Sequence, residues 1–137
     1  MNDWIGWHAQ LKHRWRLRRA ERFRHDFRRQ GCGPTSFATV ELEFHPSDEF
    51  TFSSTSRWPP TVAEAWAKAW ETAICAGVYD ALQPWGGSPY DALGVAATCV
   101  AVESDDVGSS EVAFYIAAWH ATRKLRDEGQ WDLVPRG

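Results

Sequence analysis

Apolar side chains alternate with polar ones over residues 37–44, which predicts a strand with one face in water. Phe50 and Phe52 repeat the alternation after a turn at 45–48, and we expect this strand to pair antiparallel with the first through a short hairpin. Residues 92–102 are small and apolar on both faces, as in a central strand of a sheet.

A first helix is predicted after Pro59-Pro60, where apolar residues recur at steps of three and four as far as about Leu82. Thr61 and Glu64 have the spacing of a capping box at its start. Trp66 and Trp70 lie at helical spacing, so we expect both in the core.

A second helix is predicted near the C-terminus, with Ser109 or Ser110 as its cap and Gly129 as its terminator. Its predicted stripe consists of Val112, Ile116, Trp119 and Arg123. Cations in its last turns suit the negative end of the helix dipole.

Residues 3–19 have the pattern of a basic amphipathic helix, since Trp4, Trp7, Leu11 and Trp15 recur at helical steps. Residues 22–30 fit either a helix or a strand, and Gly31–Pro34 must be a turn. The expected order is therefore a basic N-terminal helix followed by β-β-β-α-β-α. This order predicts an α+β fold in two layers, a four-stranded sheet with both long helices on one face.

The 137 residues suffice for one domain with a single core. Hydrophobic residues make up 44% and charged residues 24%, which is typical of a globular protein. No run approaches 18 apolar residues, so we expect no membrane partner. Cys32, Cys75 and Cys99 form no CxxC pair, which favours a reducing, cytoplasmic setting and gives no sign of a metal site; Cys75 and Cys99 have the character of core residues.

The charge is unevenly distributed along the chain. Residues 1–30 hold nine Lys and Arg against three Asp and Glu, a net of +6, so the remainder sums to −9 within the total of −3. A basic arm on an acidic body can bind the phosphates of nucleic acid, fold back on its own body or meet a protein partner. These alternatives stay open from composition alone.

Two strings resemble domain IV of translation elongation factor G. Gln30-Gly-Cys-Gly-Pro-Thr-Ser-Phe-Ala-Thr-Val40 follows the glycine-rich tip loop of that family, and Asp106-Val-Gly-Ser-Ser-Glu-Val-Ala-Phe114 follows its string D-V-D-S-S-E-x-A-F. The similarity covers roughly residues 22–126. It implies the family fold, which includes a left-handed β-α-β crossover. No G-x-x-x-x-G-K-[ST] occurs, so we expect no GTP binding and no translocase activity.

In that family the domain is the tip that enters the decoding site of the small ribosomal subunit, and two loops make the contacts. The matching loops here are 31–36 and 103–108. The resemblance implies RNA-binding residues at Arg24, Arg28, Arg29, Gly31, Cys32, Gly33, Ser36, Asp105 and Asp106. The arm is expected to add phosphate contacts from Arg14, Arg16, Arg18, Arg19 and Arg22.

We therefore expect the chain to consist of a basic, Trp-rich arm over residues 1–20 and a domain IV-like body over residues 21–132. Residues 133–137, Leu-Val-Pro-Arg-Gly, resemble a thrombin cleavage site left by an expression tag.

The function expected is non-enzymatic, without cofactor or metal, with ribosome or RNA as the partner. The alternative is a protein-interaction module, acting as a homodimer through the N-terminal helix or with another protein. Asp105 stands where the family commonly has His, beside Asp106, and an anionic tip favours this alternative because it repels phosphates. Exposed tryptophans of the arm favour it as well, because they often anchor protein interfaces.

Overall fold

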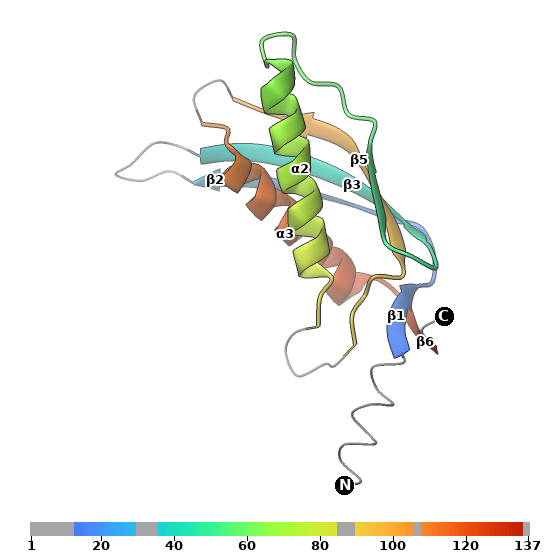
Figure 1. Ribbon diagram of the computed structural model, residues 1–137. Helices are drawn as coiled ribbons and strands as arrows, with labels where there is room; N and C mark the ends of the chain where they lie inside the picture. The colour runs from blue at the N-terminus through green and yellow to red at the C-terminus, as the bar shows by residue number, and fades with distance from the viewer. Residues whose placement is uncertain (1–12, 30–35, 85–89, 106–107, 136–137) are drawn as a thin grey trace, which may run out of the picture.

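The computed structural model describes residues 13–29, 36–84, 90–105 and 108–135. Within them the elements are β1 (His13–Leu17), β2 (Glu21–Arg29), β3 (Ser36–Pro46), β4 (Thr51–Ser54), α2 (Glu64–Ala81), β5 (Val95–Glu103), α3 (Glu111–Glu128) and β6 (Trp131–Pro135). Both helices cover one face of a four-stranded sheet, and β1 pairs with β6 in a second, two-stranded sheet (Figure 1). The predicted two-layer α+β sandwich is confirmed.

The four-stranded sheet has the order β2-β3-β5-β4. Its first three strands are antiparallel, whereas β4 runs parallel to β5 and reaches it through α2. With the helices in front and both strands running upward, β5 lies to the left of β4 (Figure 1). The crossover is therefore left-handed, as predicted, against the strong general preference for right-handed connections.

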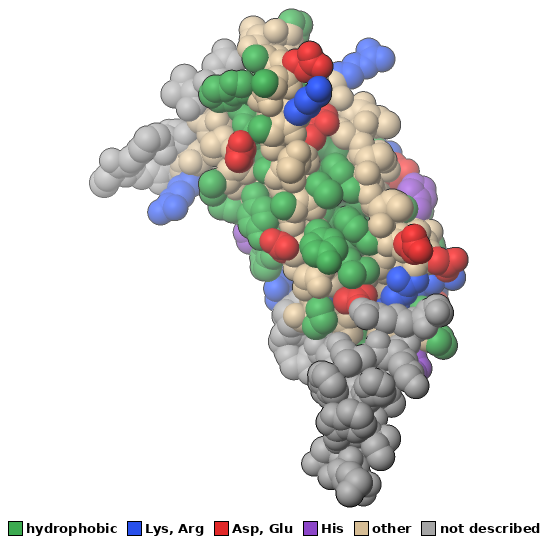
Figure 2. Space-filling view, in the orientation of Figure 1, with side chains coloured by type: hydrophobic (Ala, Val, Ile, Leu, Met, Phe, Trp, Pro, Cys, Tyr) green, Lys and Arg blue, Asp and Glu red, His purple; other side chains and the backbone are tan. Residues whose placement is uncertain are grey.

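The core lies between the sheet and the helices. Alternation along β3 buries every second side chain beneath α3, and the described part of the ambiguous segment, residues 22–29, belongs to the strand β2 with the same period of two. The largest fully buried side chains include Leu42, Phe44, Ile74, Val78, Phe114 and Leu125. On the side that carries the helices, further apolar side chains gather between α2 and β4 at the surface (Figure 2).

The prediction of a helix across residues 3–19 is wrong for 13–17, which form β1; residues 1–12 lie outside the described part. His13, Trp15 and Leu17 alternate with arginines, and this period of two competes with the helical spacing of the tryptophans. The strand is fixed by a partner far away in sequence, since β1 pairs with β6 from His13 opposite Pro135 to Leu17 opposite Trp131.

Residues 133–135, predicted to be part of a tag, thus supply most of the partner of β1. Their origin stays a prediction.

The expected hairpin between β3 and β4 is wrong, because β5 lies between these two strands. β5 is uncharged and small until its last residue, Glu103, and it occupies a central position, as predicted for 92–102. The four residues of β4 form the edge instead. Cys99 in β5 is fully buried as predicted, and burial raises the pKa of its thiol, whereas Cys75 is half-buried.

The start and the buried face of α2 agree only in part with the prediction. The capping box is wrong, because Thr61 lies in a turn closed by the Val62 N–H to the Pro59 carbonyl (2.9 Å), and α2 begins after Ala63 without a side-chain cap. Trp70 is 6% exposed, as expected in the core, but Trp66 is 60% exposed because the buried stripe begins one turn later.

In α3, Ser110 is the cap, accepting from the Ala113 N–H at 3.1 Å, and Gly129 ends the helix, as predicted. The predicted stripe of α3 is wrong: Val112 is 66% exposed, and Ile116, Trp119 and Arg123 are partly exposed. The face turned to the sheet and α2 is made largely of small residues, namely Ala113, Phe114, Ala117, Ala118, Ala121, Thr122 and Leu125. Small side chains allow the close approach of α2 and α3, so the larger residues lie at the margin.

Candidate nucleic-acid interface

The end of β2, the start of β3 and the connection from β5 to α3 meet at one end of the sheet (Figure 1). Pairing between β2 and β3 places Arg29 opposite Ser36 and Arg28 opposite Phe37. Two residues after Phe37 in β3, Thr39 lies opposite Glu103 of β5. We call this end the tip; its described residues are 28–29, 36–37, 103–105 and 108–110.

Ser109 joins the two halves of the tip. Its hydroxyl donates to the Phe37 carbonyl at 2.8 Å and accepts from the Asp105 N–H at 2.8 Å. The Phe37 N–H in turn donates to the Gly108 carbonyl at 3.0 Å. Two adjacent serines therefore have separate roles: Ser110 caps α3, and Ser109 fastens the β5–α3 connection to β3.

Arg28 and Arg29 are exposed at the end of β2. The Arg28 guanidinium lies 5.1 Å from the centre of the Phe37 ring, which holds it against the sheet by a cation–π contact. Among the described residues neither arginine forms an ion pair with a carboxylate. Their charges thus remain available to an anionic ligand.

Five other arginines of the predicted interface do form ion pairs with acidic residues of the chain. These pairs are Arg16–Asp48, Arg18–Asp132, Arg19–Glu21, Arg22 with Glu41 and Glu43, and Arg24 with Asp26 and Glu103. Each arginine of these pairs is more than 40% exposed, so the pairs contribute little stability. Binding of a phosphate by one of these arginines must nevertheless compete with its carboxylate.

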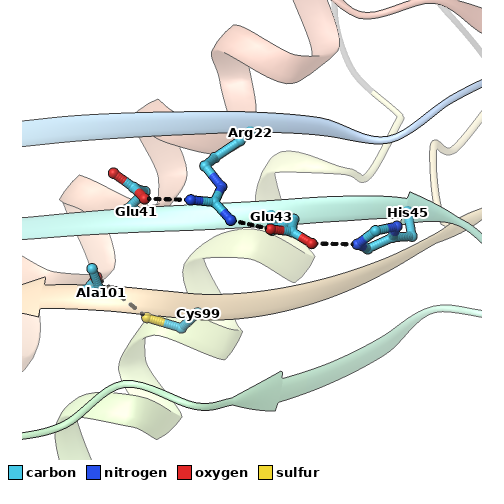
Figure 3. Close-up of polar contacts among 6 residues, drawn as sticks. All are labelled: Arg22, Glu41, Glu43, His45, Cys99 and Ala101. Carbon is cyan, nitrogen blue, oxygen red and sulfur yellow. Dashed lines mark hydrogen bonds and ion pairs between the residues drawn. The ribbon is translucent and has the colours of Figure 1, made fainter.

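The pairs of β2 and β3 form a row on the sheet face opposite the helices (Figure 3). Arg22 donates to Glu41 at 3.2 Å and to Glu43, and Glu43 also bonds His45 at 2.6 Å. The hydrogen bond from Arg22, with that of His45, lowers the pKa of Glu43. Thr39 donates to Asp26 at 2.8 Å, and this bond, ahead of the one from Arg24, lowers the pKa of Asp26.

The remaining residues of the predicted RNA interface lie in three places. Ser36 begins β3 in the tip, and Asp105 lies in the tip with its carboxylate accepting from the Gly108 N–H at 3.3 Å. Arg14 lies in β1, away from the tip. Gly31, Cys32, Gly33 and Asp106 lie outside the described residues.

An exposed aromatic surface beside the tip was missed from the sequence. Trp66 packs edge-on against Trp70, with ring centres 5.8 Å apart, and both line a hollow of about 570 Å³ that reaches Ser109 and Ser110. Trp66 lies in the first turn of α2, ahead of Trp70, which is the first buried residue of the helix. This position at the start of the helix is the signal that could have predicted its exposure.

The fold is shared with a known protein. The crystal structure of a Thermus thermophilus protein superimposes with a TM-score of 0.75 over 89% of this chain, at 22% sequence identity. The chain spans 18% of the length of that protein, and at this identity the likeness shows the fold alone. No protein-family profile matches the sequence.

Within the described part of the chain, no three His, Cys, Asp or Glu side chains gather in a way that could hold a metal ion. Neither α2 nor α3 is long and apolar enough to cross a membrane.

Proposed function

We propose that this chain is a non-enzymatic module related to domain IV of elongation factor G, which binds RNA through its tip and acts on the ribosome. The two strings that resemble the family flank the tip, and the Ser109–Phe37 contact connects them directly. The left-handed crossover and the strand order fit the same relationship. This junction is the observation that carries the proposal.

Arg28 and Arg29 take the leading role in this proposal. They combine exposure, a position at the tip and freedom from ion pairs within the described residues. Arg18, Arg22 and Arg24 lie on the same chain segment, but their carboxylate partners reduce what they offer a phosphate. We therefore expect electrostatic attraction to RNA to be concentrated at the tip.

The test is co-sedimentation of the full chain with isolated small ribosomal subunits, together with fluorescence anisotropy on a labelled single-stranded RNA. Binding is expected at low salt and is expected to weaken steadily as salt rises, because each phosphate contact releases counterions. Absence of binding to both subunit and RNA at low salt contradicts the proposal.

A protein-interaction module is the second candidate, favoured by the hollow around Trp66. Trp66 and Val112 are 60% and 66% exposed, respectively, and tryptophan is among the residues that most often anchor protein interfaces. The two candidates differ in what Trp66→Ala does. RNA binding through the arginines of the tip is expected to survive this substitution, whereas a protein contact anchored by the hollow is expected to be lost.

A further inference from the structure

β4 is an edge strand with one free side in the described structure, since its ladder is with β5. The extended conformation continues beyond the ladder, and the Thr55 N–H donates to the Cys99 carbonyl at 2.9 Å. From residue 49 to residue 58, exposed and half-buried side chains alternate without interruption. We call residues 49–58 the edge segment.

The middle of the edge segment lacks two of the features that usually prevent a strand edge from pairing with another chain, namely charges and prolines, although the strand β4 itself is short. Residues 50–56, Phe-Thr-Phe-Ser-Ser-Thr-Ser, contain neither a charge nor a proline. Natural sheets commonly protect an edge with such residues, with bulges or with a covering element. The charges stand only at the ends: Glu49 precedes this stretch and Arg57 follows it, and both are exposed.

An apolar groove accompanies the edge on the side of the helices (Figure 2). It measures about 750 Å³, and Phe50, Phe52, Cys75 and Tyr79 contribute its apolar lining. Phe50 packs on Tyr79 with ring centres 5.6 Å apart. The partner that pairs with the edge must therefore also present apolar side chains to this groove.

We propose that the partner is a second copy of this chain, paired antiparallel along the edge segment about a twofold axis at Ser53. In an antiparallel pair, residues directly opposite point to the same face of the sheet. With Ser53 opposite Ser53, Thr51 lies opposite Thr55, and Glu49 of each copy lies opposite Arg57 of the other. Two ion pairs of opposite charge then close the two ends of the uncharged stretch.

The two neighbouring registers that keep the same faces together do not match the charges. With Phe52 on the axis, Glu49 lies opposite Thr55, and Arg57 lies opposite Ser47. With Ser54 on the axis, Glu49 lies opposite Pro59, and Arg57 lies opposite Thr51. The choice of Ser53 for the axis therefore rests on charge complementarity.

The helix layer is compatible with a twofold antiparallel pairing of two copies, but it does not select the register. Ser54 bonds Glu71 at 3.2 Å and Phe50 packs on Tyr79, so α2 runs antiparallel to the edge segment beside it. Lys68 and Asp80 line opposite ends of the groove. A twofold axis across the edge turns the second α2 around, which places Lys68 of one copy toward the end that holds Asp80 of the other. Lys68 also pairs with Glu64 (3.6 Å) and Asp80 accepts from the Tyr115 hydroxyl (2.6 Å), so the main attraction between the copies is that of Glu49 and Arg57.

Disulfide capture tests the register of the full-length chain. Ser53→Cys is expected to form a disulfide-linked dimer under mild oxidation, because opposite residues of an antiparallel pair lie within reach of a disulfide. Thr51→Cys is the matched control, since its two copies are four positions out of register, and Thr51→Cys/Thr55→Cys is expected to cross-link again. The unsubstituted chain gives the background from the native cysteines. Equal cross-linking of Ser53→Cys and Thr51→Cys overturns the proposed register.

Charge reversal tests the dimer without any new cysteine, by analytical ultracentrifugation. Arg57→Glu and Glu49→Arg are each expected to weaken self-association about tenfold, and the double variant is expected to restore it. Glu128→Arg, an exposed change at the end of α3, is expected to leave it unchanged.

A monomer at all accessible concentrations overturns the proposal, and so does a dimer that these changes do not affect. The edge contains no residue of the tip, so RNA binding and self-association succeed or fail separately.

Discussion

The Ser109 hydroxyl donates to the Phe37 carbonyl at 2.8 Å, across 72 positions of sequence. The same oxygen accepts from the Asp105 N–H at 2.8 Å, so one side chain closes the β5–α3 connection and fastens it to β3. Arg28 stacks on the ring of Phe37 from the neighbouring strand. The position of the Arg28 guanidinium at the tip thus depends on Phe37, whose backbone carbonyl accepts a hydrogen bond from the Ser109 hydroxyl.

Ser109→Ala removes this junction and is expected to weaken RNA binding. The substitution should cost about 1–2 kcal/mol in the free energy of unfolding, because two hydrogen bonds are lost and each usually contributes about 0.5–1.5 kcal/mol. Ser110→Ala is the matched control, because loss of the cap of α3 costs a similar amount, about 1 kcal/mol, without touching Phe37. Urea unfolding and RNA anisotropy measured on both variants separate the two effects. Equal RNA binding by the two would show that the junction does not matter for function.

Arg126→Met is expected to destabilise the fold by about 2 kcal/mol, because a charge-assisted set of hydrogen bonds is lost in a half-buried place. The guanidinium donates to the carbonyls of Gln83 (2.7 Å) and Ala81 (3.3 Å) at the end of α2, and to that of Tyr90 (3.4 Å). Burial, followed by the nearby charge of Arg123, lowers the pKa of Arg126.

Arg123→Met is the control for Arg126→Met. Arg123 forms a partly exposed ion pair with Asp127 at 3.3 Å and lies 5.5 Å from the centre of the Trp119 ring, so this change is expected to cost about 1 kcal/mol or less in urea unfolding. A cost for Arg126→Met no larger than that of Arg123→Met would contradict the bridging role of Arg126.

Gly77→Ala is expected to destabilise the protein by about 1–3 kcal/mol, although alanine favours helices. An added Cβ would lie 2.5 Å from the Tyr115 carbonyl oxygen and 3.1 Å from the Ala118 Cβ. Thermal unfolding measures the change. Ala76→Gly, at an exposed position of the same helix, should cost about 0.5–1 kcal/mol from helix propensity alone. A stabilising Gly77→Ala would mean that the helices are further apart than described.

His25 is expected to make stability fall as the solution becomes mildly acidic. Burial, followed by the charges of Lys124 and His120, lowers the pKa of His25 below its ordinary value near 6.5. The ring stacks on His120 with centres 4.8 Å apart. Since the unfolded chain binds the proton more tightly, the contribution of His25 is complete above about pH 6.5 and is lost as the pH falls toward the folded pKa.

His25→Gln tests this dependence. Between about pH 7 and pH 5, the variant is expected to lose less of its unfolding free energy than the unsubstituted chain. Asp26, Glu43 and Asp132 have lowered pKa values, so their contributions are lost only at more acidic pH, below their ordinary range. Parallel curves for variant and parent over this interval would remove His25 as the cause.

Local patterns predicted the elements whose partners are close in sequence or whose periodicity is strong. The alternation of 37–44 predicted β3, and the two serines before an apolar run predicted the cap of α3 at Ser109 or Ser110, of which Ser110 is the cap. The buried face of α3 was predicted wrongly because large residues were given more weight than alanines. Close helix packing favours the small residues, and Val112 is left exposed.

Local sequence patterns did not predict the pairings between segments that are far apart in the chain. β1 is a strand because β6, more than 100 residues away, completes its ladder. Within the candidate site, Arg28 and Ser36 follow from the strand ends, but the ion pairs of Arg18 and Arg24 join residues 114 and 79 positions apart. These acidic partners decide which arginines stay available to a phosphate. A count of charges along the sequence does not reveal such pairs, because the two residues of each pair are far apart in the chain.

The most direct test of an RNA-binding tip compares two charge reversals of equal size in full-length protein. Arg28→Glu/Arg29→Glu is expected to weaken binding to small ribosomal subunits strongly and to reduce the salt dependence of what remains. Arg18→Glu/Arg19→Glu changes the net charge equally at the other end of β2 and is expected to have a much smaller effect. Equal losses from the two pairs, or none from either, would contradict an RNA-binding tip.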